Sequence, residues 1–406
     1  MENLELELEK NRQTEIVEPY KLPAGWKWCK QSEVCKLVDG EKIADKEYPY
    51  LEVKYLRGTK EKSFVTSGKL IKKGTKVILV DGENSGEVFA IHEDGYMGST
   101  FKALSIENVD ENYLQYFITT KKDLYRNNKK GSAIPHLNKD LFKNMPFPLP
   151  PTLAEQQRIV NRIETMFAKL NQAQEKAQTV LDSFETRKAA ILHKAFNGQL
   201  KIDNEELSIE DWEDTTIGEC CKLGSGGTPL KSHPEYYENG NIPWLKTGEI
   251  DWNDIYDVEE KITNAGVENS SAKIFPAESV VVAMYGMGVT RGKAAIIKIP
   301  TTTNQAVCVL QPNEKLNNRF LFYYFMCNYW QVREQSVGGN QLNLSGKIIA
   351  GFPIKFPPLN YQLSIVNFLD TVLEKESRAK EAAQNVLDQI ALLKKSILAR
   401  AFRGEL

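Results

Sequence analysis

The feature that most constrains this chain of 406 residues is an internal repeat. Residues 180–200 return as residues 386–406 at a constant distance of 206 positions, and no gap interrupts the match back to Pro151 and Pro357. A repeat of this kind means that one structural plan is used twice, so any fold proposed for one half must serve the other.

A weaker echo lies upstream, where Trp26 and residues 35–37 match Trp212 and residues 221–223 at a distance of 186 positions. The second copy therefore carries about twenty additional residues between its tryptophan and its proline. The predicted organisation is a leader (1–25), a first variable domain (26–150), a first repeated helix (151–200), a linker (201–211), a second variable domain (212–357) and a second repeated helix (358–406).

In both repeated segments apolar residues alternate at spacings of four and three, which is the period of a coiled-coil seam. Neither segment contains proline or glycine between its opening prolines and Gly198 or Gly404, so each is predicted to be one helix of about 65 Å that ends at its glycine. The predicted seam comprises Ile159, Ile163, Met166, Leu170, Ala173, Ala177, Val180, Phe184 and Ile191 in the first copy, and Ile365, Leu369, Val372, Ala379, Ala383, Val386, Ile390, Leu393 and Ile397 in the second.

Two helices with matching seams are expected to pair, and the large block between them favours an antiparallel pair. The alternative is that each helix packs along the surface of its own domain. Glu376 interrupts the second stripe, and we expect it to lie where packing is loose or to face another protein.

The variable domains combine strand and helix signals. Apolar runs bounded by glycine or proline, such as residues 76–80 and 279–285, predict strands, and residues 113–117 and 320–325 predict helices. The expected fold class is α+β: two globular α/β domains with twisted sheets, joined by two long helices in an antiparallel coiled coil with a pseudo-twofold repeat.

The net charge of the whole chain does not indicate a nucleic-acid partner, because 52 Lys and Arg residues are balanced by 54 Asp and Glu residues. The first variable domain nevertheless has a net charge of +4 and the second of -2. The lysine-rich stretches 54–76 and 121–143 are compatible with a solvated face or with phosphate contacts.

The compartment is predicted from cysteines and the N-terminal segment. The six cysteines form no C-x-x-C pair, and the acidic N-terminal segment does not resemble a signal peptide. With no apolar run of the length of a membrane span, we expect a cytoplasmic protein.

Catalytic signatures are absent from the sequence. Residues 286–293 do not match a phosphate-binding Walker loop, the four histidines lack metal-ligand spacing, and no Asn-Pro-Pro-aromatic tetrapeptide of amino-methyltransferases occurs. We therefore expect a protein that binds and scaffolds, with no metal, cofactor or catalytic residue in this chain.

Specific phrases give a family resemblance. Each variable domain is followed by two prolines and a leucine that open a long helix, and each helix closes with Ala-Phe-x-Gly. The matching residues are Pro150, Pro151, Leu153, Glu155, Gln156 and Ile159 in the first copy, and Pro357, Pro358, Leu359, Gln362 and Ile365 in the second. With residues 22–26, 226–229, 242–249, 304–306 and 340–344, these phrases resemble the specificity subunit of type I restriction-modification systems over nearly the whole chain. Two departures are Tyr361, where the family has glutamate, and the first domain's lack of the Gly-Gly-Thr-Pro phrase.

The resemblance implies a non-catalytic DNA-binding subunit. Each variable domain would be a target recognition domain for one half of a bipartite, asymmetric site in double-stranded DNA. The coiled coil would set the gap and dock two methyltransferase subunits, and motor-nuclease restriction subunits would join them. S-adenosylmethionine, ATP and magnesium would belong to those partners.

For base contacts we expect polar residues in loops, because amide and guanidinium groups pair with base edges. The predicted DNA-binding residues are Lys54, Arg57, Asn84, Ser85, Ser132, His136 and Asn138 in the first domain, and Lys246, Thr247, Tyr285, Arg291, Lys293, Gln305, Asn340, Gln341 and Asn343 in the second. Two other functions remain open: a stand-alone restriction or methyltransferase enzyme, and a coiled-coil scaffold with two domains for ligands other than DNA.

Overall fold

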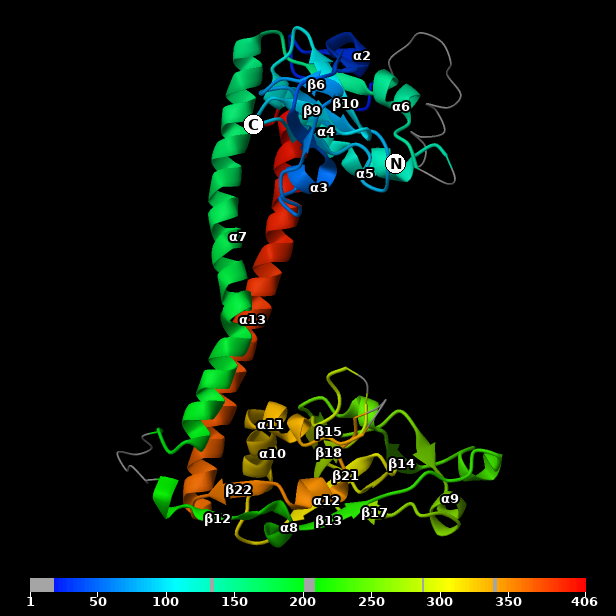
Figure 1. Ribbon diagram of the computed structural model, residues 1–406, viewed down its shortest axis with the longest axis vertical. Helices are drawn as coiled ribbons and strands as arrows, with labels where there is room; N and C mark the ends of the chain where they lie inside the picture. The colour runs from blue at the N-terminus through cyan, green and yellow to red at the C-terminus, as the bar shows by residue number, and fades with distance from the viewer. Residues whose placement is uncertain (1–17, 132–134, 201–208, 287, 339–341) are drawn as a thin grey trace. The chain divides into compact units, whose positions relative to one another are not determined.

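A computed structural model describes residues 18–131, 135–200, 209–286, 288–338 and 342–406 (Figure 1). The chain divides into two compact units: unit 1 contains Met1–Gln178 and Gln384–Leu406, and unit 2 contains Thr179–Ala383. Each unit contains one sheet-rich domain, here called head 1 (residues 26–150) or head 2 (residues 212–357), together with segments of both long helices.

The two repeated segments form the long helices predicted from the sequence. Helix α7 spans Leu153–Phe196 and helix α13 spans Leu359–Phe402, and each has 44 residues. Both helices end shortly before a glycine in the left-handed region, Gly198 at φ 66° and Gly404 at φ 72°. The absence of a Cβ lets glycine adopt this conformation, which explains where the helices end.

Within unit 1 the helices run antiparallel, as predicted. The Arg158 guanidinium donates to the carbonyl oxygen of Leu406 at 3.0 Å, and the Lys394 ammonium donates to Gln174 Oε1 at 2.8 Å. Residue numbers rise along α7 as they fall along α13, and Figure 1 shows the two helices side by side.

Unit 2 repeats the arrangement and corrects one expectation. Glu185 lies 3.8 Å from Lys380, and Arg187 Nε donates to Glu376 Oε2 at 2.9 Å. Glu376 therefore does not sit at a loosely packed point: it forms an ion pair with Arg187 across the seam.

Most predicted seam residues are sheltered from solvent. The buried ones are Ile159, Ile163, Ala177, Phe184, Ile365, Leu369, Ala383 and Ile390. The partly buried ones are Met166, Leu170, Ala173, Val180, Ile191, Val372 and Ile397. The prediction is wrong for three residues of the second copy, which are exposed: Ala379, Val386 and Leu393.

The physical reason is a shift of the buried stripe on the last third of α13. Val386 is 39% exposed and Leu393 is 49% exposed, whereas their neighbours Leu387 and Lys394 are partly buried. A straight helix drifts relative to a strict 3.5-residue repeat, so the position that faces inward moves by one residue.

Head 1 has three sheets in its described residues. They are β1 (Lys27–Lys30) with β11 (Pro146–Leu149); β2 (Cys35–Val38), β10 (Phe101–Ile106), β7 (Lys76–Leu79) and β8 (Val88–Ala90) in that order; and β3 (Glu41–Ile43), β6 (Gly68–Ile71), β9 (Gly95–Met97), β4 (Tyr48–Leu51) and β5 (Phe64–Val65). The helices of head 1 are α2 (Gln31–Val34), α3 (Val53–Leu56), α4 (Glu111–Thr120), α5 (Lys122–Asn127) and α6 (Lys139–Asn144).

Head 2 repeats this plan among its described residues. Its sheets are β12 (Glu213–Thr216) with β22 (Pro353–Phe356); β13 (Cys221–Ser225), β21 (Val307–Pro312), β18 (Val280–Ala283), β19 (Ala294–Ile297) and β15 (Asp254–Ile255); and β16 (Lys261–Ile262), β14 (Ile242–Leu245), β20 (Thr301–Thr303) and β17 (Ile274–Phe275). Its helices, with the short 3-10 turns η2 and η3, are α8 (Ile217–Cys220), η2 (Pro234–Tyr236), η3 (Thr247–Glu249), α9 (Asn264–Glu268), α10 (Asn318–Cys327), α11 (Tyr329–Glu334) and α12 (Gly346–Ala350). The 3-10 turn η1 (Ile209–Asp211) directly precedes head 2.

The central strand of each head is buried on both faces. In β18, Val280 and Val282 face the core that contains the long helices, whereas Val281 and Ala283 face the core between the sheets. In head 1, Ile78 of β7 and the following Val80 face the core that contains the long helices, whereas Val77 and Leu79 face the core between the sheets. Burial on both faces explains why these strands read as continuous apolar runs.

Each head is completed by the closing phenylalanine of a long helix. Phe402 of α13 packs on Tyr113 and Phe117 of α4, with ring centroids 5.0 and 5.4 Å apart. In unit 2, Phe196 of α7 packs on Phe320 of α10 at 5.0 Å. The Ala-Phe-x-Gly phrases thus anchor the helix ends in the two head cores.

Candidate nucleic-acid interface

In head 1 the loop after β7 lies against the segment that precedes α6. The Leu137 amide donates to the Val80 carbonyl oxygen at 2.7 Å, and His136 forms isolated β-bridges with Asp81 and Lys130. We call this region junction 1 (residues 81–87 and 135–138). It brings together four residues that the sequence singled out: Asn84, Ser85, His136 and Asn138.

Hydrogen bonds orient the polar groups of junction 1. His136 Nδ1 lies 2.7 Å from Asp81 Oδ1, and the rest of the exposed imidazole faces solvent. Asn138 caps α6, because its side chain accepts from the Leu141 amide at 3.1 Å. Asn84 is half-buried. His136 thus offers the most accessible polar edge of these residues.

Ser85 departs from its predicted role. Its side chain is fully buried, and its hydroxyl has no hydrogen-bond partner among the described residues. A buried hydroxyl cannot reach a base edge, so the prediction that Ser85 contacts DNA is wrong for this conformation. Ser132 lies outside the described residues.

The two predicted cations of head 1 lie on and just after α3. Arg57 forms an ion pair with Glu87, which joins α3 to junction 1. Lys54, three residues earlier, is exposed on the same short helix. The structure therefore places Arg57 beside the junction.

Head 2 has the equivalent contact. The Leu344 amide donates to the Met284 carbonyl oxygen at 3.0 Å, as Leu137 does to Val80, and Asn343 bridges Val337. We call this region junction 2 (residues 284–286, 288–293 and 342–344). It gathers four predicted residues, Tyr285, Arg291, Lys293 and Asn343, whereas Asn340 and Gln341 lie outside the described residues.

Junction 2 holds polar groups that its own contacts leave unsatisfied. Arg291 Nη1 donates to the Leu342 carbonyl oxygen, but Arg291 Nε and Asn343 Oδ1 are buried without a partner among the described residues. Tyr285 is 39% exposed. Unpaired buried polar atoms are rare in folded proteins and commonly mark functional positions.

Three predicted residues of head 2, Lys246, Thr247 and Gln305, lie outside junction 2, and Lys293 lies at its end. Gln305 is exposed and accepts from the Thr228 hydroxyl at 2.6 Å, and its neighbour Ala306 accepts from the Met284 amide at 2.9 Å. Lys246, next to Thr247 at the end of β14, pairs with Glu260. The half-buried Lys293 pairs with Asp251.

Much of the basic charge of head 1 is neutralised internally. Lys129 pairs with Glu83 at 2.8 Å, and the pKa of Asp39 falls to about 2 because Lys102 and Lys69 donate hydrogen bonds to it. Lys76 is buried, which lowers its pKa, and it donates to Asn112. The lysine run is therefore largely a paired face, and Lys76 is part of the core instead of a phosphate contact.

Sequence reasoning missed three residues that support the junctions. Asp81 holds His136, Glu87 holds Arg57, and Arg333 of α11 donates to backbone carbonyls of junction 2. Asp81 directly follows a strand, and Arg333 follows Tyr329 at helical i,i+4 spacing, so position and periodicity were the available signals.

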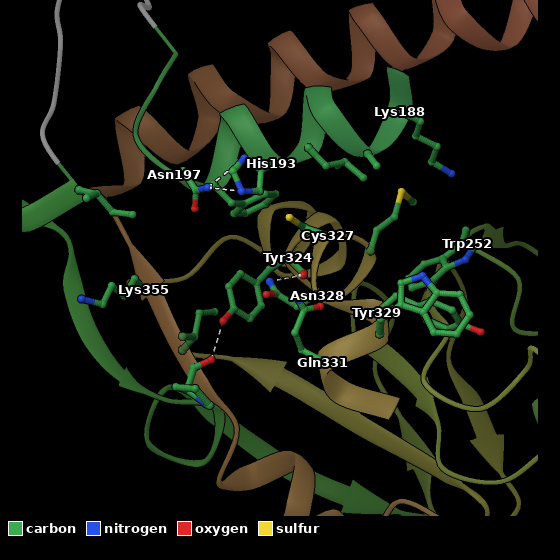
Figure 2. A pocket seen from close by; sticks show the side chains of 18 of the residues that line it. Lys188, His193, Asn197, Trp252, Tyr324, Cys327, Asn328, Tyr329, Gln331 and Lys355 are labelled. Carbon is green, nitrogen blue, oxygen red and sulfur yellow. Dashed lines mark hydrogen bonds between the residues drawn. The ribbon is translucent and has the colours of Figure 1, made fainter. Parts of the chain in front are cut away.

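A cavity of about 720 Å³ lies in unit 2 where the end of α7 meets α10, α11 and β22 (Figure 2). Leu192, Met326, Tyr324 and Trp330 contribute apolar surface to it. Burial lowers the pKa of Lys188, whose side chain also lines the cavity. The cavity contains none of the predicted base-contacting residues.

The described residues also bear on two other expectations. Among them, no group of three or more His, Cys, Asp or Glu side chains could hold a metal ion. No helix in the described part of the chain is long and apolar enough to cross a membrane.

Comparisons with known proteins give one consistent result. The type I restriction enzyme MjaVIII specificity subunit of Methanocaldococcus jannaschii is 26% identical, covering 95% of this chain and 94% of that protein. The StySPI specificity subunit of Salmonella potsdam is 24% identical over 95% of this chain and 90% of its own length.

Solved structures share the fold. An HsdS subunit from Thermoanaerobacter tengcongensis superposes with a TM-score of 0.62 at 19% identity, covering 96% of this chain and 99% of that chain. A chain from a structure of a type I R-M system gives a TM-score of 0.74 at 18% identity, covering 96% of this chain and 100% of that one.

The family profile described as "Type I restriction modification DNA specificity domain" matches residues 23–180 and 209–389. The two matches begin close to Trp26 and Trp212, where the two variable domains begin, and together they cover most of the chain. This protein therefore belongs to the type I restriction-modification DNA specificity family.

Proposed function

We propose that this chain is the non-catalytic specificity subunit of a type I restriction-modification complex and that each head reads one half of a bipartite, asymmetric DNA site. One observation carries the proposal: the two heads share a scaffold but carry different side chains at equivalent places. His136 of junction 1 corresponds to Asn343 of junction 2, because the residues that follow them make the same backbone contact.

The chemistry of the junctions suits base recognition. Asn343 can pair with adenine, and Arg57 and Arg291 are suited to guanine. The two heads offer different sets of such groups, so they would prefer different base sequences. Lys54 and the other exposed cations would contact phosphates, which position a protein without selecting a sequence.

In this proposal the paired helices space the heads and dock two methyltransferase subunits, which restriction subunits join. The relatives are named as specificity subunits of type I restriction enzymes, which supports such an assembly. S-adenosylmethionine, ATP and magnesium would be bound by the partners, and the complex would act on DNA in the cytoplasm.

Methylome sequencing tests the proposal. The gene is introduced, with the genes of its methyltransferase partners, into a host that lacks them. We expect a methylated motif of two specified halves separated by unspecified positions, and no such motif without this chain. A continuous motif, or methylation that does not depend on this chain, would contradict the proposal. Methylation by the purified chain alone would instead support a stand-alone enzyme.

Binding to DNA gives an independent test against a scaffold for other ligands. We expect the purified complex to retard random DNA fragments at low salt and to lose this binding steeply as salt rises, because phosphate contacts release counterions. Binding that is absent at low salt would favour the scaffold.

The spacer role has its own test. Four residues inserted after Ala173 add about 6 Å to α7, so we expect a gap longer by about two base pairs, with both half-site sequences unchanged. An unchanged gap would remove the spacer role and leave base recognition by the heads intact.

A further inference from the structure

The loop of junction 2 is held by two side chains of the short helix α11. Arg333 Nη1 donates to the Arg291 carbonyl oxygen at 2.5 Å, and Arg333 Nη2 donates to the Gly288 carbonyl oxygen at 2.7 Å. The Tyr329 hydroxyl donates to the carbonyl oxygen of Val289. Two residues one helical turn apart thus grip three backbone carbonyls of one loop.

The gripping groups are themselves fixed. The Arg333 guanidinium lies 5.2 Å from the centroid of the Tyr329 ring and 5.7 Å from that of Trp330, and it donates to the Tyr329 hydroxyl at 3.1 Å. A planar guanidinium that packs beside aromatic rings keeps its fork of donors in one orientation. Arg333 therefore imposes its geometry on the loop.

The loop needs these contacts because its glycines provide few side chains that could fix its conformation. Gly288 and Gly292 have φ values of 63° and 86°, and Gly286 has 146°. These residues have wide conformational freedom and no side chains to pack. A Cβ on Gly292 would lie 3.0 Å from Arg333 Cγ, so the loop is seated directly on the arginine.

The position of the loop decides where the candidate base-contacting groups of head 2 point. Arg291 belongs to the loop and donates to the carbonyl oxygen of Leu342 on the facing segment. Asn343 follows Leu342 directly. A loop released from α11 would move Arg291 and loosen its contact with the segment that carries Asn343.

Head 1 fixes its loop differently. Helix α5 follows α4 as α11 follows α10, and both α5 and α11 have six residues. This places Arg126 in the position of Arg333, but Arg126 is exposed. Junction 1 is instead held by the Asp81–His136 contact and by the Arg57–Glu87 and Lys129–Glu83 ion pairs. Arg126 is therefore a matched control.

We propose that Arg333 and Tyr329 are positioning residues that set the base preference of head 2 without contacting DNA. This inference rests on the proposed function. Loss of these hydrogen bonds to the loop should lower the sequence discrimination at the half-site read by head 2 and leave the other half-site unchanged.

The test is methylome sequencing of the full complex carrying Arg333→Ala, Arg333→Lys, Tyr329→Phe or Arg126→Ala. For Arg333→Ala we expect discrimination at one or more positions of one half-site to fall about tenfold, which is the scale of losing one base contact. Arg333→Lys should restore part of it, because lysine can reach one carbonyl but not two. Tyr329→Phe should have a smaller effect on the same half, and Arg126→Ala none.

A merely structural role would look different. Uniform loss of methylation at all sites with a lowered melting temperature for Arg333→Ala, together with an unchanged motif for Tyr329→Phe, would overturn the inference. An unchanged motif for Arg333→Ala would overturn it as well. Failure of the proposed function is distinguishable, because then the unsubstituted complex would give no bipartite motif.

Discussion

The two heads share a scaffold and differ at the places that would meet DNA. Gln156 at the start of α7 accepts from the amide of Asp110, the N-cap of α4, and Gln362 at the start of α13 accepts from the amide of Asn317, the N-cap of α10. The two heads thus share the hydrogen bond that links the start of the long helix to the N-cap of α4 or α10. Junctions 1 and 2, by contrast, are held by different side-chain contacts, which shows that the scaffold tolerates a change at these places.

The two units also differ beside the long helices. In unit 1, Lys395 of α13 lies 3.3 Å from Asp123 of α5. The equivalent residues of unit 2 are Ala189 and Trp330, which line the cavity at the end of α7. An ion pair in one unit is thus replaced by apolar surface in the other, so the repeat does not extend to surface contacts.

The largest effect is expected from the closing phenylalanines. Phe402→Ala should destabilise head 1 and Phe196→Ala head 2, each by about 3–5 kcal/mol, because a buried ring leaves a cavity. Hydrogen exchange measured by mass spectrometry would locate the loss in one head. Leu392→Ala, at a site that is 68% exposed, is the control. Equal losses in both heads from either phenylalanine would contradict the shared plan.

Substitution of Gln156 and Gln362, which accept hydrogen bonds from the N-cap amides of α4 and α10, should have the next largest effect. Gln156→Ala leaves the Asp110 amide unpaired and should cost about 1–3 kcal/mol. Gln362→Ala should cost more, because Gln362 also donates to the carbonyl oxygens of Lys315 and Pro357 at 2.7 and 2.8 Å. Chemical unfolding of the two variants in parallel measures the difference. A greater loss for Gln156→Ala would break the comparison.

A smaller effect is expected for the stability of head 1 at acidic pH. The pKa of Asp39 lies at about 2 in the folded chain because Lys102 and Lys69 donate hydrogen bonds to it, whereas an unfolded aspartate titrates near pH 4. Because the pKa of Asp39 is lower in the folded chain than in the unfolded chain, its ionised carboxylate stabilises the folded state above pH 4. This contribution to stability is lost as the pH falls toward 2. Head 2 has Ser225 at the equivalent position.

Asp39→Asn should therefore flatten the acid dependence of head 1 and leave that of head 2 unchanged. Hydrogen exchange between pH 5 and pH 2.5 reports both heads in one sample. If the variant and the original chain lose head 1 protection with the same pH profile, the ion cluster around Asp39 has no role in stability.

The smallest effect is expected for Lys395→Ala. Both side chains of the Lys395–Asp123 pair are more than two-thirds exposed, and exposed ion pairs contribute between zero and about 1 kcal/mol. We expect a change below about 0.5 kcal/mol in chemical unfolding. A change of several kcal/mol would mean that the helix end in unit 1 depends on this pair.

The architecture could be predicted from the sequence because it rests on periodic and repeated signals. The 3.5-residue stripe predicted both long helices, and Gly198 and Gly404 predicted their ends. The stripe failed at Val386 and Leu393, because a strict repeat cannot describe a helix whose buried face shifts as it enters a domain core.

The interface was harder to predict than the fold. Polar residues in loops have no periodicity, so a buried hydroxyl such as that of Ser85 and an accessible imidazole such as that of His136 look alike in sequence. Lys76 was grouped with surface lysines although it is buried on its strand. The role of Arg333 depends on backbone carbonyls of a distant loop, which no side-chain pattern encodes.

The most direct test of the central claim compares the two heads in one experiment. Methylome sequencing of complexes carrying His136→Ala or Arg291→Ala should show that each substitution relaxes one half of the recognised site, a different half for each. If either substitution altered both halves, or if both altered the same half, the account of two heads that read DNA independently would be contradicted.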